Sequence, residues 1–569
     1  MKSRRGYYYG QIVQGLEYNP RLFLYLLIFG VVVVYAYQFA SQLSTQWIVA
    51  GFASLGILAG LAIMVWPFQA VMLYLGLAIW YHSFLRGGTM VGMGSALVYP
   101  GDVFVGAFLV VEFFRGCMRQ THLYTATDRW MVALFAWSLC CTARGLSSYG
   151  YSAVGESREF LHCISYFIAI HYVTRVEQTD LVLRWLKWIC IITAVVQLYF
   201  VFAVRGFLPR FVGGNLVHEY GCLNIVVLGV LLGRDHIKRP LSGTWVVILG
   251  GGVLLILGTA VANIYSPSLM ADLVGFLGIA RSSQSGPSSF AVALMLPLGV
   301  AAAATLHMAI QQRPMAALGI AVLLVLTFYS AMRAVVASIL VTLPFLLWIT
   351  RRHFFKTLLL GAIAMILGTI VITIMNPLLE GQLGEFFGRL YRGIIDPSQD
   401  PTGSWRLYGW QWEMERIFSN PFWVLIGQGF GGYYEWYFNL TDEILRTGVH
   451  NQFIQFWSKM GLLGVSLFLA VVFSFYNQAF RFLQKSTDEF QRSVMMILML
   501  VVFANLVDMW VGQSMITLWP ILAIGTALPR LWLSNPADAP VTSEDAQMRS
   551  RVSSGALRRR PSQSPVFSR

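Results

Sequence analysis

The sequence predicts an all-α polytopic membrane protein, and three observations support that prediction. Of the 569 residues, 57% are hydrophobic and only 12% are charged, whereas a soluble globular chain has about 25% charged residues. The mean hydropathy is +0.64. Apolar stretches of about 17–25 residues, the length of a membrane-spanning helix, run through nearly the whole chain. A soluble multidomain enzyme and a disordered or fibrous chain are therefore excluded.

The expected spans follow one another with few interruptions. Several stretches are short or broken by Gly and Pro, so we expect about 14–16 transmembrane helices. The sixteen candidates lie near residues 21–40, 47–66, 68–84, 97–114, 129–146, 159–174, 185–204, 219–233, 244–264, 289–309, 315–331, 334–350, 357–376, 452–477, 493–511 and 513–530.

This arrangement predicts five regions along the chain. They are a cytoplasmic N-terminus at 1–20, a multi-span region at 21–376, one large outer loop at 377–449, C-terminal transmembrane helices at 450–530, and a disordered basic cytoplasmic tail at 531–569. The outer loop is rich in Trp, Tyr, Gly and Arg, so it is too aromatic for a disordered segment. Loops of that length in a folded domain usually carry function.

The positive charge of the chain gives its orientation. The formal net charge is +14, and a basic excess often indicates nucleic-acid binding. Here about two thirds of the Lys and Arg residues fall on one side of the expected spans if the N-terminus is placed inside, as the positive-inside rule requires. The charge is therefore an orientation signal. We expect both termini in the cytoplasm and no nucleic-acid partner.

A short helix is expected in the outer loop at residues 402–421. Ser404 is the expected N-cap, and Asn420-Pro421 the expected stop. Trp405, Tyr408 and Trp412 then fall on one helical face. Such a face suits a helix resting on the bilayer surface, where Trp and Tyr concentrate. It also suits an aromatic platform for sugar rings, and the two readings are compatible.

His450 follows this loop where the chain re-enters the membrane. Asn451 comes next, and the following helix holds Gly461 and Gly464, which allow close helix packing. A neutral imidazole at this boundary suits a general base. Alternatively, a lone histidine only donates a hydrogen bond to a loop carbonyl. Other residues are needed to choose between these two roles.

Two arginines on the outer side favour a functional site. Arg333 lies between two expected spans with almost no loop around it, and Arg281 lies just before a span. A guanidinium near the bilayer is costly unless it pairs or faces a polar cavity, and it binds phosphate oxygens in bidentate fashion. The pair therefore suggests a diphosphate lipid, with Arg210 as a weaker third candidate. Snorkelling to the interface remains the alternative for each.

Other motifs give no support for a cofactor. The segment 427–432 reads GQGFGG, but no βαβ unit surrounds it, so we expect a tight loop turn there. No nucleotide-binding phosphate loop is present, and no His, Asp or Glu cluster has the spacing of a metal site. We therefore expect no cofactor and no metal.

The ordered set of motifs resembles the O-antigen ligase and O-antigen polymerase superfamily of bacterial envelope proteins. The resemblance covers roughly residues 275–475. It rests on an outer Arg before one span, an Arg after the next span, a long outer loop with a Ser/Gly-Arg-x-x-x-Trp segment, Asn-Pro and a Gly-rich turn, and a final His-Asn before Gly-x-x-Gly. In this chain these are Arg281, Arg333, Ser404 to Trp410, Asn420-Pro421, Gly427 to Gly432, His450-Asn451 and Gly461 to Gly464.

The resemblance implies a membrane glycosyltransferase of the C-type fold in the bacterial inner membrane, with its active site in the periplasm. The donor would be a glycan on undecaprenyl diphosphate, and the reaction would be inverting and metal-independent. The product would be a longer exopolysaccharide or O-antigen, the outcome we favour. Alternatively, a ligase would transfer the glycan to lipid A core or to protein. The partners would be the lipid-linked oligosaccharide, the growing polysaccharide or lipid A core, the bilayer and other polysaccharide export proteins.

The same resemblance assigns roles to residues. Arg281 and Arg333 would stabilise the leaving diphosphate, and His450 would accept the proton of the attacking hydroxyl. We expect these three catalytic residues to line one outer cavity. Arg210, Arg406 and Asn451 would contact substrate, and the aromatic residues Trp405, Tyr408, Trp412, Tyr433 and Trp436 would hold the sugars.

A function of another class, a transporter of polysaccharide or lipid-linked sugar, stays open at this point. A transporter predicts inverted repeats and charges deep in the spans. We see no internal repeat, and the charges gather at span ends and in the outer loop.

Overall fold

The structure is a computed structural model. It describes parts of 54–72, residues 91–93, 96–98, 100–115, 125–173, 178 and 181, then 401–438 without 433, 443–446, 448–449, 451–511 and 518–533.

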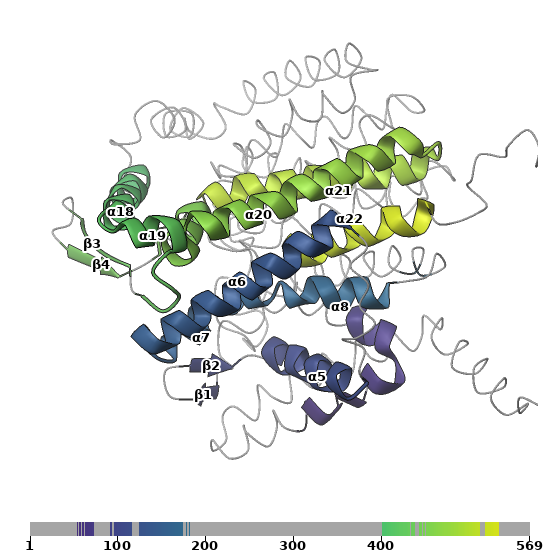
Figure 1. Cartoon of the computed structure of the whole chain (residues 1–569), viewed down its shortest axis with the longest axis horizontal. Helices are drawn as coiled ribbons and strands as arrows, with labels where there is room; N and C mark the ends of the chain where they lie inside the picture. Colours follow the sequence, from purple (N-terminus) through teal and green to yellow (C-terminus); the bar gives the residue numbers. More distant parts are fainter. Residues whose placement is uncertain are drawn as a thin grey trace, which may run out of the picture.

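The described part is mostly helical, which confirms the helical character predicted from the sequence (Figure 1). The helices are α5 (Pro100–Arg115), α6 (Ala126–Tyr149), α7 (Ser152–Leu161), α8 (Ile164–Tyr172), α18 (Pro401–Phe418), α19 (Pro421–Ile426), α20 (Gln452–Lys485), α21 (Glu489–Val511) and α22 (Leu518–Leu533). Two antiparallel hairpins complete it, β1 (Val91–Met93) with β2 (Ala96–Val98) and β3 (Glu435–Phe438) with β4 (Glu443–Arg446).

By length and composition, α6 and α20 could each cross a membrane. They contain 24 and 34 residues, and 24 helical residues extend about 36 Å, more than the hydrocarbon thickness. They coincide with the spans predicted near 129–146 and 452–477. The total number of spans stays a prediction.

One predicted span is divided in the structure. The stretch near 159–174 falls on the end of α7 and on α8, with His162 and Cys163 between them. Both linking residues keep right-handed helical dihedrals. Hydrogen bonds from Ser165 N to the His162 carbonyl and from Tyr166 N to the Cys163 carbonyl span three residues, so a tight helical turn joins α7 to α8.

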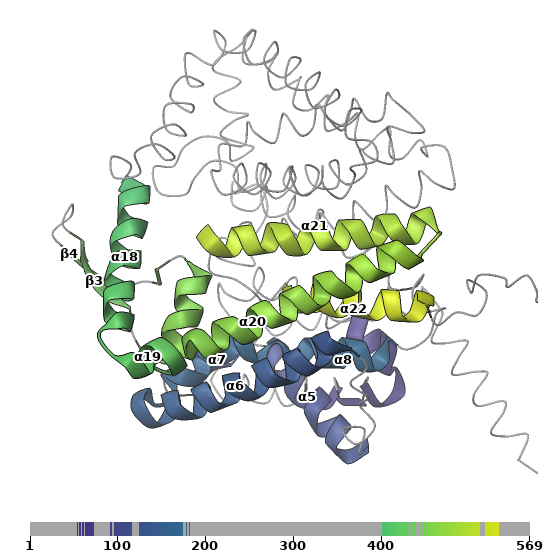
Figure 2. The same ribbon diagram turned by 45° about the horizontal axis from the view of Figure 1, so that its top comes forward.

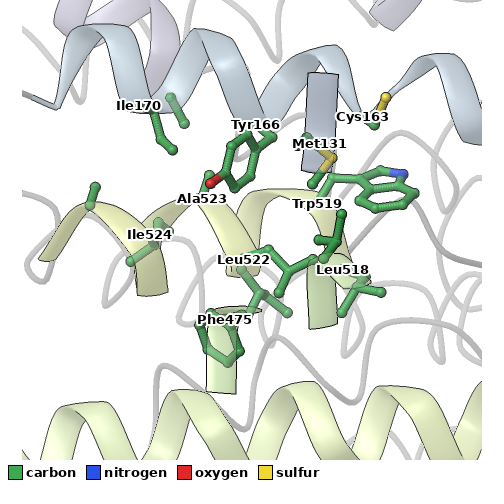
Figure 3. Close-up of a cluster of buried hydrophobic side chains, with 14 of the residues drawn as sticks. Met131, Cys163, Tyr166, Ile170, Phe475, Leu518, Trp519, Leu522, Ala523 and Ile524 are labelled. Atoms are coloured by element: carbon green, nitrogen blue, oxygen red, sulfur yellow. The ribbon is translucent and has the colours of Figure 1, made fainter. Parts of the chain in front are cut away.

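The core lies where α6, α8, α20 and α22 meet. Apolar side chains from all four helices gather there, and Tyr166 and Trp519 are among the largest that are fully buried (Figure 3). The Tyr166 hydroxyl donates to Asp128 Oδ1 at 2.7 Å. Asp128 also closes the capping box with Thr125 at the start of α6, so this bond fixes α8 to the N-terminus of α6.

Hydrogen bonds pair the ends of neighbouring helices at both ends of the bundle. At one end Thr127 on α6 lies 3.5 Å from Gln478 near the end of α20. Arg530 on α22 donates to the carbonyl of Val173 after α8. At the other end Arg144 on α6 donates to the Ile426 carbonyl in the outer-loop region. Residues predicted on one side of the membrane thus share one end of the bundle; which end faces the cytoplasm stays a prediction.

Candidate functional site

The predicted site residues fall into two groups. Arg210, Arg281, Arg333, Tyr433 and His450 lie outside the described residues, so their proposed common cavity stays a prediction. The others are described: Trp405, Arg406, Tyr408 and Trp412 on α18, Asn451 at the start of α20, and Trp436 on β3.

The helix predicted in the outer loop is present, but its start was predicted wrongly. Helix α18 begins at Pro401, so Ser404 is a buried residue inside the helix and not its N-cap. Proline is favoured in the first turn because its missing N–H is not needed there. The predicted stop is correct: α18 ends at Phe418, and the Asn420 side chain caps the next helix, α19, with Pro421 as its first residue.

The aromatic residues of α18 have different environments. Tyr408 is 40% exposed, whereas Trp405 and Trp412 are half-buried. The Trp405 ring packs on Trp436 with centroids 5.7 Å apart. Trp436 is only 2% exposed, and a Cβ on Gly409 would lie 3.0 Å from its ring. Trp436 thus supports α18 from beneath, and its contact with sugar stays a prediction.

The backbone on both sides of His450 is held in place. Trp410 Nε1 donates to the carbonyl of buried Val449 at 2.7 Å. On the other side, the Asn451 side chain caps α20 by accepting from Phe453 N at 3.0 Å and Ile454 N at 3.1 Å. These bonds fix the chain immediately before and after His450.

Asn451 has a second feature that fits its predicted contact with substrate. Its side chain is fully buried, and its Nδ2 has no hydrogen-bond partner among the described residues. A buried donor without a partner costs about 1–3 kcal/mol, a cost that a bound hydroxyl or phosphate oxygen would relieve.

Helix α20 is broken at Gly461, which divides it into a short arm, residues 452–460, and a long apolar segment (Figure 2). Gly461 has φ 70° and ψ −178°, a conformation essentially restricted to glycine. A Cβ there would lie 2.3 Å from the Leu425 carbonyl oxygen and 2.4 Å from Gly427 N. The close packing predicted from this glycine is confirmed, with a kink that the sequence did not indicate.

The three carbonyls before the kink, of residues 458–460, have found other partners. Gln428 N donates to the Ser458 carbonyl at 2.8 Å, and Gly429 N donates to the Lys459 carbonyl at 3.0 Å. Trp137 Nε1 on α6 donates to the Met460 carbonyl at 2.8 Å. In a membrane, backbone groups released by a helix break must be satisfied within the protein, so the kink depends on these partners.

The glycine turn, residues 427–432, provides most of those partners. Gly427, Gly429 and Gly431 all have positive φ, at 71°, 88° and 97°, which confirms the predicted tight turn. A Cβ on Gly431 would lie 2.7 Å from Ala153 N, and one on Gly145 of α6 would lie 2.1 Å from the Phe430 carbonyl oxygen. The turn is thus packed against both α20 and the end of α6 and start of α7.

A buried ion pair lies beside this turn. Lys459, in the arm of α20, is only 1% exposed, and its Nζ lies 3.1 Å from Glu156 Oε1 of α7. It also donates to the Gly432 carbonyl and sits 4.4 Å from the centre of the Tyr434 ring. The charges were expected only at span ends and in the outer loop. Lys459 corrects this expectation, because it is a charged residue buried within the predicted span 452–477.

A second pair, Glu413 and Arg416 on α18, lies next to the first. Arg416 Nη2 is 2.8 Å from Glu413 Oε1 and 3.4 Å from Ser458 Oγ. The guanidinium stacks 5.1 Å from the Trp412 ring and 5.8 Å from the Tyr434 ring. Burial raises the pKa of Glu413, while Arg416 opposes the shift. Burial and the nearby Glu156 and Glu413 carboxylates raise the pKa of Tyr434 well above its usual value.

The four charges of this cluster balance. Two carboxylates face two cations, so the cluster offers no net positive potential to a diphosphate, and phosphate binding stays with the predicted arginines. Removing one partner of a buried ion pair costs about 3–5 kcal/mol, whereas replacing both can be neutral. The cluster therefore holds α7, α18, the glycine turn and the arm of α20 together. The sequence held one signal for it, a lysine inside an otherwise apolar span.

A known protein family matches the part of the chain that contains most of these site residues. Residues 316–469 match the family model described as O-antigen ligase. No curated protein and no solved structure matches the chain significantly. The matched range includes Arg333, α18, the glycine turn, His450 and the arm of α20, and it confirms the resemblance drawn from these motifs. Over residues 316–469 the chain is thus similar to the O-antigen ligase family, which supports the resemblance to the O-antigen ligase and polymerase superfamily.

Proposed function

We propose that the protein is a periplasmic-facing membrane glycosyltransferase that uses a glycan on undecaprenyl diphosphate to extend an exopolysaccharide or O-antigen. The observation that carries the proposal is the fixed chain around His450 inside the matched family domain. Trp410 holds the residue before it, and Asn451 caps the helix after it. A general base needs such a defined position to reach its proton.

The proposed reaction needs no metal. The acceptor hydroxyl oxygen attacks the anomeric carbon on the face opposite the diphosphate, and His450 takes the hydroxyl proton. The bond from the anomeric carbon to the diphosphate oxygen breaks, and its electron pair leaves with undecaprenyl diphosphate, so the configuration inverts. Arg281 and Arg333 stabilise the charge that develops on the leaving group.

The sugars would lie against α18. Tyr408 is exposed there, and the half-buried Trp405 and Trp412 are held by Trp436 and Arg416. Arg406 on the same helix and the unpaired Nδ2 of Asn451 would bind polar groups of the substrate.

A ligase is the second candidate, because the description of the matched family is O-antigen ligase. Its acceptor would be lipid A core or a protein in place of the growing polysaccharide. The membrane, inner-membrane location and other export proteins remain part of the proposal in both cases.

One experiment separates these functions. Purified protein is incubated with lipid-linked repeat units, without nucleotide or metal, and the products are resolved on a gel. We expect a ladder of lengthening glycans. Transfer only to added lipid A core or protein means a ligase, and no transfer to any acceptor contradicts the proposal and favours a transporter.

Replacing Trp410 by phenylalanine should reduce turnover about 10-fold, because a small displacement of a catalytic group has a large kinetic cost. The variant keeps an aromatic ring against Trp510 but loses the bond to the Val449 carbonyl. The rate of glycan transfer by folded protein is the measurement. Trp130→Phe, at an exposed position on α6, is the control, and equal rates for both variants would contradict the role of Trp410.

A further inference from the structure

The arm of α20 cannot take its direction from the helix that follows it. Gly461 interrupts the helical backbone, so the contacts of residues 452–460 with the rest of the protein decide where the arm points. The arm begins directly after Asn451, and its direction therefore sets the position of Asn451, the residue that follows His450 in the sequence.

Several hydrogen bonds and one ion pair tie the arm to its surroundings near the kink. The Ser458 and Lys459 carbonyls accept from the glycine turn, the Met460 carbonyl accepts from Trp137, and Trp457 Nε1 donates to the Val424 carbonyl. The Lys459 side chain then reaches past the turn to Glu156 on α7.

Glu156 holds both parts at once. Its Oε1 pairs with Lys459 at 3.1 Å, and its Oε2 accepts from Gly431 N. Lys459 in turn donates to the Gly432 carbonyl. The Glu156 carboxylate thus connects three segments: α7, which carries it, the end of the glycine turn, and the arm of α20.

Of the two carboxylates in the cluster, Glu156 is the one that pairs with Lys459. Glu413, the other carboxylate of the cluster, accepts from Arg416 at 2.8 Å. Among the described residues, Glu156 is the carboxylate within ion-pair distance of Lys459. Without it, a cation that is 1% exposed would be left in the interior without its counter-ion.

We propose that Glu156 is a positioning residue of the transferase site, acting through Lys459 on the direction of the α20 arm. This inference rests on the proposed function. It extends the site to α7, which lies outside the matched residues 316–469. A segment of the N-terminal part of the chain would thereby be required for the chemistry at His450.

The test compares Glu156→Gln with the double variant Glu156→Gln, Lys459→Gln. The single variant leaves a buried lysine without its counter-ion, and we expect turnover per folded molecule to fall about 10- to 100-fold with little change in KM for the lipid-linked donor. The double variant removes both charges, and its amides can still bond the glycine turn. Its turnover should return to within about 3-fold of the original protein.

Glu415→Gln is the matched control, because Glu415 lies exposed on α18 and its neutralisation should leave turnover and KM unchanged. The midpoint of thermal unfolding is measured for every variant. A double variant as slow as the single one, or a single variant with a lower midpoint and normal turnover, overturns the positioning role.

Failure of the proposed function gives a different result. If the unmodified protein transfers no glycan, the proposed function is wrong. The coupling between Glu156 and Lys459 is then tested by the unfolding midpoints alone. Midpoint shifts of the two single variants, Glu156→Gln and Lys459→Gln, that simply add in the double variant would overturn the coupling as well.

Discussion

Replacing His450 by alanine is expected to lower the rate of glycan transfer by about 100- to 10,000-fold, the usual contribution of a general base. Alanine cannot take the proton of the attacking hydroxyl. The fold should persist, because Trp410 and Asn451 fix the chain on either side of this position. Single-turnover transfer from the lipid-linked donor, measured with purified protein in detergent or lipid discs, gives the effect on chemistry.

The control for this variant is His353→Ala, which lies within the matched domain at a position that the predicted topology places on the inner side of the membrane. It should transfer glycan at the original rate. Transfer by the His450 variant within a few-fold of that rate would exclude the general-base role. Normal insertion and an unchanged unfolding midpoint are required of both proteins.

Replacing Gly461 by alanine should destabilise the protein by about 3 kcal/mol or more and remove transfer activity with it. The dihedrals of this residue, φ 70° and ψ −178°, are strained for any side chain. The added Cβ would also lie 2.3 Å from the Leu425 carbonyl oxygen, a backbone atom that cannot move aside alone. The kink and its bonds to the glycine turn would be lost together. The measurement is the midpoint of thermal unfolding and the yield of monodisperse protein.

Gly155→Ala on α7 provides the comparison for this prediction. A Cβ there meets nothing within 4 Å, and alanine is favoured over glycine inside a helix by about 1 kcal/mol. The control should therefore unfold at the original temperature or slightly above it. Equal unfolding midpoints for the two variants would show that the kink at Gly461 does not need a glycine.

Several features were predictable because they depend on nearby residues alone. The apolar lengths of α6 and α20 follow from composition. The stop of α18 follows from Asn420-Pro421, and the turn at 427–432 from glycines that allow positive φ. The start of α18 was missed because Pro401 opens the helix earlier than Ser404, and both residue types are common near helix starts. The burial of Trp436 was missed because no strand was expected at residues 435–438, where β3 places this side chain beneath α18.

The sequence by itself determined a helical, apolar chain, the turn and helix signals of the outer loop, and the motifs that resemble the O-antigen ligase and polymerase superfamily. Only the tertiary structure decided what surrounds them. Trp137 is 323 positions from the carbonyl it bonds at the kink, and Glu156 is 275 positions from the turn it holds. Local periodicity carries no information about such partners. They are selected when burial forces each released carbonyl and each buried charge to find a partner in whichever segment packs against it.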